Sequence, residues 1–498
     1  MKKLIEKIGA ALLSSILAVT FIISPICSVS AFAEPIKSGN GTRLTFAAWG
    51  DPQISNYMSS REEHIVASAL DLKNSQSVID AMVIAGDITE NASDNEYDSI
   101  AKYLTGTGVG AFITAEGNHD IRLGNYNDAK SKFVSFTNRI NSAVGSSINI
   151  DGMHYSCTVK GYKFIVLGSD DTEFEESYIS NSQLKWLDSQ LASSTKSGKP
   201  VFVVMHQPLK DTHGLPDTWG SSDDSAGSVG DQSDKIKDIL NKYKNVVLIT
   251  GHLHTGFGQY SYEKIGNINS VNLPSIGVDN ESGSYNKNGL GYITEVYDNE
   301  VVFRARNFEE GVYVPEYDIK IQLDKVKSVA LSADTYVYDG KAKKPSVTLY
   351  GYDGKKISSK NYKVTYPKGR KNIGEYKIKI TFKNALKGNP VNYATFTVGP
   401  KGTNISSLKA EKKKLTVKWK KQTSKTDGYE IQYDTSSKFT NAKTVTVSGN
   451  KKESKTISSL KSKKKYYVRI RTYKTVKSNG KKIKAYAPWS KAKTVTVK

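Results

Sequence analysis

The chain has 498 residues, which is too long for one hydrophobic core and typical of about three domains. Its net charge of +22 conceals a division. From Lys325 to Lys498 there are 44 basic and 9 acidic residues, a net charge of +35, whereas the preceding segment has 27 basic and 40 acidic residues, a net charge of −13, and all seven histidines. This division argues against a single uniform domain.

The first 33 residues are typical of a secretory signal peptide. A basic start, an uncharged apolar run and a small-x-small site follow one another at Lys2-Lys3, Ile8–Ile23 and Ala31-Phe32-Ala33. A membrane anchor is the alternative, but the run is short and no basic cluster follows it. We therefore expect a secreted, extracellular protein at a bacterial surface, with no transmembrane segment in the mature chain. Cys157 is then its single cysteine, so an internal disulfide is excluded.

Between Arg43 and His254, short apolar runs alternate with amphipathic segments. The expected strands are 44–49, 81–85, 111–115, 164–167, 201–205 and 246–250, and the expected helices are 61–72, 96–104, 128–140, 183–191 and 234–243. This alternation predicts a layered α/β core with largely parallel strands. Three further strands, at 270–273, 292–297 and 301–306, are expected to close a second sheet.

From about Asp324 onward the pattern is that of β-sandwiches. Short alternating runs occur at 347–350, 376–381, 415–419, 429–433 and 467–471, and Gly399-Pro400-Lys401-Gly402 separates two modules. Residues 400–498, with Trp419, Leu460 six residues before Tyr466, and Trp489, resemble a fibronectin type III domain. Residues 323–399 resemble the immunoglobulin-like repeats of bacterial surface proteins.

Five short polar motifs follow predicted strands in the acidic part of the chain. They are Gly50-Asp51-Pro52-Gln53, Gly86-Asp87, Gly117-Asn118-His119-Asp120, His206-Gln207-Pro208 and Gly251-His252-Leu253-His254. Alone, a Gly-Asp is usually a turn. Because the carboxyl ends of neighbouring parallel strands lie along one edge of the sheet, the ordered set predicts convergence at one site.

Such a set suits a pair of divalent cations. Two metals about 3.5–4 Å apart need a bridging ligand, for which a carboxylate is well suited. Imidazole together with amide or carboxylate oxygen favours manganese, iron or zinc.

In this order the motifs resemble those of the calcineurin-like metallophosphoesterases, over residues 43–310. The resemblance implies a four-layer α/β sandwich, assigned to residues 34–322. It also implies that Asp51, Gln53, Asp87 and His254 hold one metal, and that Asp87, Asn118, His206 and His252 hold the other. Further implications are that His119 lies near the leaving-group oxygen as proton donor or charge stabiliser, that Asp120 orients the His119 ring, and that a metal-bridging hydroxide attacks phosphorus.

Gln53 departs from the commoner pattern of that family, which has histidine at this position. An amide oxygen in place of a nitrogen donor predicts weaker metal binding there and a preference shifted from zinc toward manganese or iron.

Other polar residues have simpler interpretations. His64 and His154 are expected to be ordinary core or surface residues, and Cys157 a packed side chain. The polar segment 210–234, which contains His213 and Trp219, is expected to form either a substrate wall or a surface loop.

The basic segment 325–498 favours a polyanionic partner, and secretion points to an anionic cell-wall polymer. No nucleic-acid recognition pattern is present, so specific nucleic-acid binding is not expected. The alternative is a lysine-rich, solvated surface.

The sequence thus predicts a secreted, metal-dependent phosphoesterase retained at the cell surface. A phosphodiester is favoured as substrate, because no basic residues near the motifs suggest a clamp for a terminal phosphate. The alternative is a surface-binding adhesion protein that uses an inactive phosphoesterase scaffold.

Overall fold

The computed structural model describes residues 34–220, 223, 225–478 and 480–498. The predicted signal peptide, residues 1–33, lies outside the described residues. The chain divides into two compact units, one ending at Ile321 and the other beginning at Gln322. In the described ranges, no helix has both the length and the apolar character needed to cross a membrane.

The first unit contains two mixed β-sheets. One has the order β12 (Val312–Tyr313), β11 (Glu300–Asn307), β10 (Leu290–Val296), β1 (Leu44–Trp49), β2 (Ala81–Ala85) and β3 (Phe112–Ala115), with β13 (Ile319–Gln322) beside β11. The other has the order β4 (Tyr155–Val159), β5 (Tyr162–Val166), β6 (Val201–Val204), β7 (Val246–Thr250), β9 (Ile268–Asn272) and β8 (Tyr262–Ile265). Strands β1 to β3 are mutually parallel, as are β5, β6, β7 and β9.

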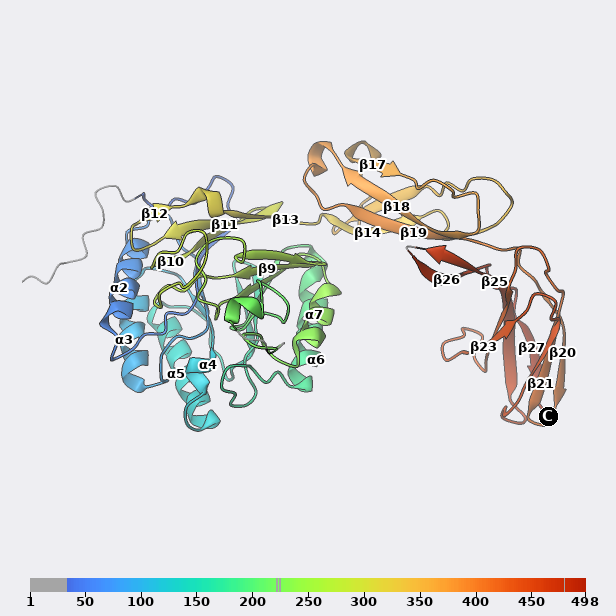
Figure 1. Cartoon of the computed structure of the whole chain (residues 1–498), viewed down its shortest axis with the longest axis horizontal. Coiled ribbons are helices and arrows are strands. Elements are labelled where there is room, and N and C mark those ends of the chain that lie inside the picture. The colour runs from blue at the N-terminus through green and yellow to red at the C-terminus, as the bar shows by residue number, and fades with distance from the viewer. Residues whose placement is uncertain (1–33, 221–222, 224, 479) are drawn as a thin grey trace, which may run out of the picture. The chain divides into compact units, whose positions relative to one another are not determined.

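Helices cover the outer face of each sheet (Figure 1). The helices α2 (Ser59–Lys73), α3 (Asp94–Thr105) and α5 (Tyr126–Ala143) lie on the side of the first sheet, and α6 (Asn181–Ser194) and α7 (Ser233–Asn241) on the side of the second. A short helix, α4 (Asn118–Ile121), follows β3.

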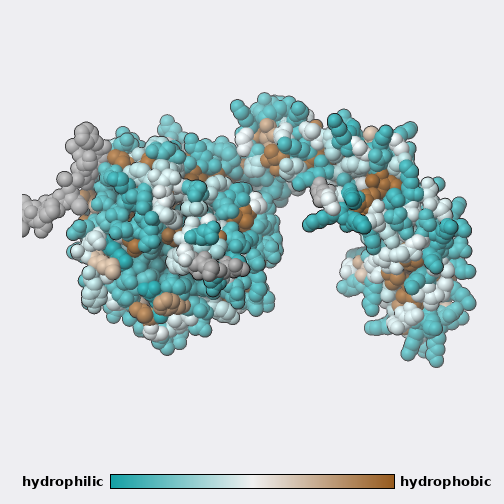
Figure 2. All heavy atoms as spheres, viewed as in Figure 1, coloured by the Kyte–Doolittle hydropathy of each residue, from teal (hydrophilic) through white to brown (hydrophobic). Residues whose placement is uncertain are grey.

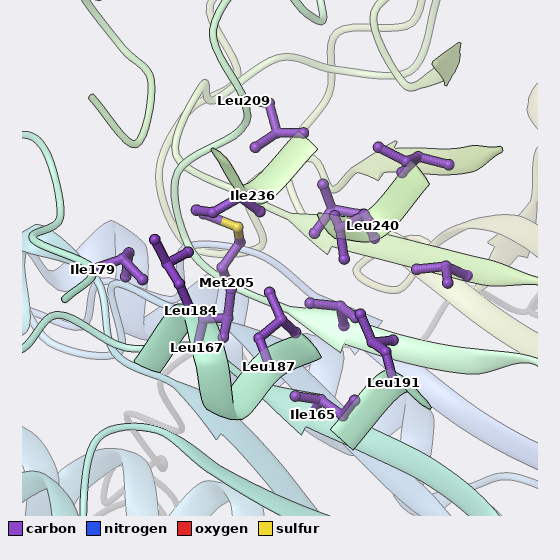
Figure 3. Packing of buried hydrophobic residues seen from close by; sticks show 14 of the residues in the cluster. Ile165, Leu167, Ile179, Leu184, Leu187, Leu191, Met205, Leu209, Ile236 and Leu240 are labelled. Carbon is purple, nitrogen blue, oxygen red and sulfur yellow. The ribbon is translucent and has the colours of Figure 1, made fainter. Parts of the chain in front are cut away.

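Alternating side chains of the second sheet build two separate cores, because successive residues of a strand point to opposite faces. Phe164 and Phe202 face the first sheet, where both rings meet Phe46 edge-on, with centroids 5.5 and 5.1 Å away. Their neighbours Ile165 and Val203 join the apolar cluster that α6 and α7 cover (Figure 3). The result is the predicted four-layer α/β sandwich, which is thereby confirmed.

One part of the predicted topology is wrong. The strands expected at 292–297 and 301–306 do not close the second sheet but belong to the first. There β10 pairs antiparallel with β1, from Leu44↔Val296 to Ala48↔Tyr292. All seven residues of β10 are buried, as suits a strand in the middle of a sheet covered on both faces.

The second unit is all-β, as predicted, and contains two hydrophobic cores. The strands around the first core are β14 (Val326–Leu331), β15 (Thr335–Val337), β16 (Val347–Gly351), β17 (Tyr362–Thr365), β18 (Gly374–Phe382) and β19 (Asn392–Gly399). Those around the second are β20 (Ile405–Glu411), β21 (Lys414–Trp419), β22 (Gly428–Asp434), β23 (Lys443–Ser448), β24 (Ser454–Ile457), β25 (Lys465–Ser478), β26 (Lys481–Tyr486) and β27 (Lys493–Thr496).

The second core has the features on which the fibronectin type III resemblance was based. Trp419 is buried against Tyr429, with ring centroids 5.1 Å apart. The Tyr466 hydroxyl accepts a hydrogen bond from the backbone N–H of Lys461 at 3.1 Å. A tyrosine that returns to the backbone a few residues upstream is the tyrosine corner of such sandwiches.

A buried ion pair joins α2 to β11 in the first unit. The Arg306 guanidinium is fully buried and donates to both carboxylate oxygens of Asp71, at 2.7 and 2.8 Å. It also donates to the carbonyl oxygens of Glu34 and Gly311 and lies over the ring of Tyr313. Arg306 therefore ties the first described residue of the chain and α2 to the first sheet.

We expect Arg306→Ala to destabilise the first unit by about 3–5 kcal/mol, because it leaves the Asp71 carboxylate buried without its partner. Chemical denaturation followed by tryptophan fluorescence measures the loss. The matched control is Arg43→Ala, which breaks the solvent-exposed pair with Asp298 and should leave the unfolding midpoint nearly unchanged. Equal midpoints for the two variants would contradict this role of Arg306.

Candidate metal centre

The predicted metal ligands lie at the carboxyl ends of five strands. Strands β1, β2 and β3 of the first sheet and β6 and β7 of the second end beside these residues, which are Asp51, Gln53, Asp87, Asn118, His206, His252 and His254. Six of the seven are buried and His254 is partly exposed. Residues up to 203 positions apart in the sequence thus converge where the two sheets face each other.

Asp87 belongs to two groups of possible ligand atoms. One group is formed by Asp87, His206 and His252 and the other by Asp51, Asp87 and His254, each with its atoms within 4.8 Å of one another. His206 Nε2 is 3.2 Å from Asp87 Oδ2 and 3.1 Å from His252 Nδ1, and His254 Nε2 is 3.4 Å from Asp51 Oδ1. A carboxylate shared between two such groups has the position that a bridging ligand requires.

Two amide side chains complete the set, and a glutamate orients each of them. Asn118 donates from Nδ2 to Glu175 at 3.0 Å, which turns its Oδ1 toward His206 Nε2, 3.1 Å away. Gln53 donates from Nε2 to Glu90 at 2.8 Å, which leaves its Oε1 for the centre. Each amide therefore presents an oxygen, the atom that can bind a cation, on the inside.

The donor atoms fit a pair of cations. Gln53 Oε1 and His254 Nε2 are buried and have no hydrogen-bond partner in the structure. Buried polar atoms are nearly always paired in native proteins, so two unpaired atoms among the predicted ligands need a partner. A divalent cation would satisfy both.

The backbone at these positions is strained. Asp51, Gln53, Asp87, His252 and His254 have φ values of 47°, 40°, 46°, 75° and 45°. Each non-glycine residue in this left-handed region costs of order 1–3 kcal/mol, and such residues cluster at functional sites. Five of the seven predicted ligands share the feature, so the backbone itself is shaped to aim these side chains.

The glycines of the motifs provide space for the ligands. Gly86 has a φ of 89°, and a Cβ there would lie 2.4 Å from Nδ1 of His206. At Gly117 a Cβ would lie 2.1 Å from Oδ1 of Asp87. Any side chain at either position would displace a ligand.

The electrostatic environment keeps Asp87 and His252 in the states that bind cations, whereas His206 has to lose a proton first. Burial opposes protonation of the His206 ring, but Asp87 raises its pKa to about 10. Burial opposes ionisation of Asp87, but the neighbouring His206 lowers its pKa overall. Burial lowers the pKa of His252 well below its ordinary value, which keeps this imidazole neutral. An ionised carboxylate and a neutral imidazole are the forms that coordinate metal ions.

His119 lies at the edge of the centre, as expected, but Asp120 does not orient its ring. The His119 ring is placed instead by the backbone carbonyl of Glu90, 3.0 Å from Nδ1. The Asp120 carboxylate accepts the backbone N–H groups of Ile88, Thr89 and Gly117, each at 3.0 Å. Asp120 lies within α4 and fixes the turn that follows Asp87, because its carboxylate accepts these backbone N–H groups.

Four charged residues around the ligands were missed by the sequence analysis. Burial alone would raise the pKa of Glu90, but hydrogen bonds from His119 and Arg61 lower it to about 2. Arg122 lies between the two orienting glutamates, 3.6 Å from Glu90 and 3.7 Å from Glu175. From the sequence, no basic residue that would suggest a phosphate clamp was expected near the motifs. Arg122 does lie there, three residues after His119, but it is paired with both glutamates.

Trp219 packs directly against the metal centre. Its ring stacks on the His252 imidazole with centroids 4.3 Å apart and an interplanar angle of 18°. The same segment is anchored by the buried His213, whose Nδ1 lies 2.6 Å from the Tyr260 carbonyl oxygen and whose Nε2 lies 2.8 Å from Ser270 Oγ. The described part of 210–234 therefore forms one wall of the site.

The remaining candidates lie elsewhere. His64 is bound to Glu309, and His154 pairs with Asp170 and packs on Trp186. Burial raises the pKa of the Cys157 thiol to about 12, so it is not a nucleophile near neutral pH.

Comparison with known proteins identifies the class of the first unit. Residues 45–256 match the calcineurin-like phosphoesterase family, and residues 399–485 match the fibronectin type III domain. The first unit therefore contains a calcineurin-like phosphoesterase domain, which places it among the hydrolases of phosphate esters, and the second unit contains a fibronectin type III domain. Both predicted resemblances are confirmed, whereas the immunoglobulin-like assignment of 323–399 stays a prediction.

The relatives of the first unit are distant. A 3',5'-cyclic-nucleotide phosphodiesterase of Nostoc is 21% identical over 43% of this chain and 70% of its own length. A probable glycerophosphodiester phosphodiesterase of Arcobacter nitrofigilis is 24% identical over 37% of this chain and 60% of its own length. A purple acid phosphatase from yellow lupin superposes with a TM-score of 0.40 and 14% identity, over 58% of this chain and 55% of the lupin chain.

Proposed function

We propose that this protein is a secreted phosphodiesterase that uses two divalent cations and is held at the cell surface by its basic second unit. The observation that carries the enzymatic part is the position of Asp87 between two groups of ligand atoms, surrounded by buried donors without partners. A site of this kind suits hydrolysis of a phosphate ester by activated water.

Two cations bound here would polarise the phosphate and lower the pKa of a water molecule. The protein contributes the orientation of the ligands through Glu90 and Glu175, and the exclusion of bulk water by the Trp219 wall. His119 lies on the partly exposed side, with 12% of its side chain accessible, where it can donate a proton to the leaving oxygen.

A diester is the favoured substrate, for two reasons. Both relatives above are named as phosphodiesterases. Near neutral pH a monoester approaches two negative charges, whereas a diester carries one. Glu90 and Glu175 offset the charge of Arg122 in the outer part of the site, so little free positive charge remains for a second negative charge.

Secretion is supported by the composition of residues 1–33, and surface retention by the charge of the second unit. The net charge of +35 from Lys325 onward attracts polyanions such as an anionic cell-wall polymer.

Asp87→Ala should lower phosphodiesterase activity by more than about 100-fold, because the loss of residues that merely support metal ligands already costs 10–100-fold. The measurement pairs bis(p-nitrophenyl) phosphate with p-nitrophenyl phosphate, before and after chelation and metal replacement. Asp128→Ala, which removes an exposed carboxylate on α5, is the matched control and should retain full activity. Wild-type protein that binds metal without any turnover would instead favour the inactive scaffold.

Gln53→His should increase zinc retention, because a nitrogen donor replaces an amide oxygen and zinc favours nitrogen ligands. We expect the wild-type protein to lose zinc more readily than manganese or iron during dialysis, and the variant to reverse that order. Metal content by mass spectrometry after dialysis tests the difference. Two tightly bound zinc ions in the wild-type protein would contradict the proposed preference.

Full-length protein should bind purified cell walls in a manner that weakens steeply between about 50 and 500 mM salt, because screening shortens the range of charge attraction. A fragment of residues 322–498 should show the same dependence, and a fragment of residues 34–321 should not bind. If the 322–498 fragment does not bind cell walls, or binds them independently of salt, surface retention by charge is contradicted. Its lysines then serve only as a solvated surface.

A further inference from the structure

Exposed apolar side chains are concentrated around the metal centre. Within the described part of the first unit, six large hydrophobic residues are exposed: Tyr57, Met58, Val78, Leu123, Phe174 and Tyr178. Val78 precedes β2 and lies toward the amino ends of the strands. The other five, which we call the apolar rim, lie in segments after the carboxyl ends of β1, β3 and β5.

The apolar rim is linked to the ligands by contacts of its neighbours. Phe174 lies 5.4 Å from the Arg122 guanidinium, and the adjacent Glu175 holds the amide of Asn118. Leu123 follows Arg122 directly and is 49% exposed. Phe174 is therefore one residue from Glu175, which contacts the predicted ligand Asn118, and Leu123 is one residue from Arg122, which pairs with Glu175.

The other side of the rim, formed by Tyr57 and Met58, is connected to Glu90. Tyr57 and Met58 stand at the start of α2 and are 88% and 45% exposed. In the first turn of that helix, Arg61 donates to Glu90 and to the backbone carbonyl of Gln53. Arg61 and Arg122 both contact Glu90, so both sides of the rim are connected to the carboxylate that orients Gln53. Figure 2 shows hydrophobic surface near the position of α4, within largely hydrophilic surroundings.

Single exposed hydrophobic residues are common on protein surfaces, but a group of them around a site marks an interaction. The two partly buried arginines, whose side chains are 14% and 17% exposed, are already paired with Glu90 and Glu175, so the phosphate of a partner would be taken by the proposed cation pair. A partner that complements both the cations and the apolar rim carries a negative phosphate and an apolar chain. Water-soluble phosphodiesters supply only the first.

We propose that the substrate is an amphiphilic phosphodiester presented at a lipid surface, on which the apolar rim docks. This inference rests on the proposed function of the same site. The rim enters the apolar layer while the phosphate reaches the metal centre. Hydrolysis forms a P–O bond to the oxygen of water and breaks the P–O bond to the leaving alcohol, which takes up the proton.

The test uses two substrates that differ in one chain. Hexadecyl p-nitrophenyl phosphate, dispersed in phosphatidylcholine vesicles, is compared with soluble ethyl p-nitrophenyl phosphate. The zwitterionic carrier avoids charge attraction to the basic second unit. With full-length wild-type protein we expect kcat/KM to be at least about tenfold higher for the hexadecyl ester, because burial of even one large apolar side chain provides that much.

The matched variants separate docking from chemistry. Met58→Ser/Leu123→Ser should remove most of the preference for the hexadecyl ester, measured as the ratio of the two rates. Val78→Ser, which removes an exposed hydrophobic residue remote from the rim, should leave the ratio unchanged. Hydrolysis of the ethyl ester without a preference for the hexadecyl ester, or a preference that survives Met58→Ser/Leu123→Ser, would overturn the lipid-surface proposal and leave the phosphodiesterase intact.

A binding measurement keeps the two proposals distinguishable. Full-length Asp87→Ala should sediment with phosphatidylcholine vesicles, and the additional changes Met58→Ser/Leu123→Ser should abolish this. If neither ester is hydrolysed by the metal-loaded wild-type protein, the proposed function fails, and the sedimentation result alone decides whether the rim docks on lipid. Failure of Asp87→Ala to sediment would overturn the docking surface.

Discussion

The central constraint in this molecule is the burial of two carboxylates within a few ångströms of each other. Asp51 and Asp87 are almost completely inaccessible, and both lie close to His206. Buried charges are tolerated only when opposite charge compensates them. The glycines beside the ligands, the left-handed backbone and the facing sheets all keep these carboxylates where cations can neutralise them.

Around this centre lies a second set of charges with a different task. Glu90 and Glu175 each turn one amide so that its oxygen faces inward, and Arg122 lies between them. Outer partners of this kind fix the direction of a ligand and tune its affinity. A neutral amide at position 53 is a usable donor because Glu90 removes its freedom to rotate the nitrogen inward.

The sequence predicted those parts of the fold that local patterns determine. Strands such as 44–49 and 246–250 were placed at their observed bounds, since buried parallel strands are continuous apolar runs. The convergence of Asp51, Asp87 and His254 was also predicted, because each follows such a strand. The pairing of β10 with β1 was not, since sheet membership depends on contacts across about 250 residues that no local pattern encodes.

The residues that support the site were hidden for a similar reason. Glu90 and Glu175 lie in loops and Trp219 in a short 3-10 helix between strands, where composition says little about side-chain direction, and only the fold brings them to the ligands. The resemblance implied that Asp120 orients the His119 ring, whereas the Asp120 carboxylate binds the backbone of Ile88 and Thr89.

The close approach of Gly86 to His206 sets the mutational tolerance of the site. An exchange at Gln53 replaces one donor side chain by another, and its expected effect is a change in metal preference. A substitution at residue 86 has no such outlet, since its Cβ would occupy the volume of the imidazole ring itself. The glycine that makes room for His206 is therefore as necessary to the site as the imidazole itself.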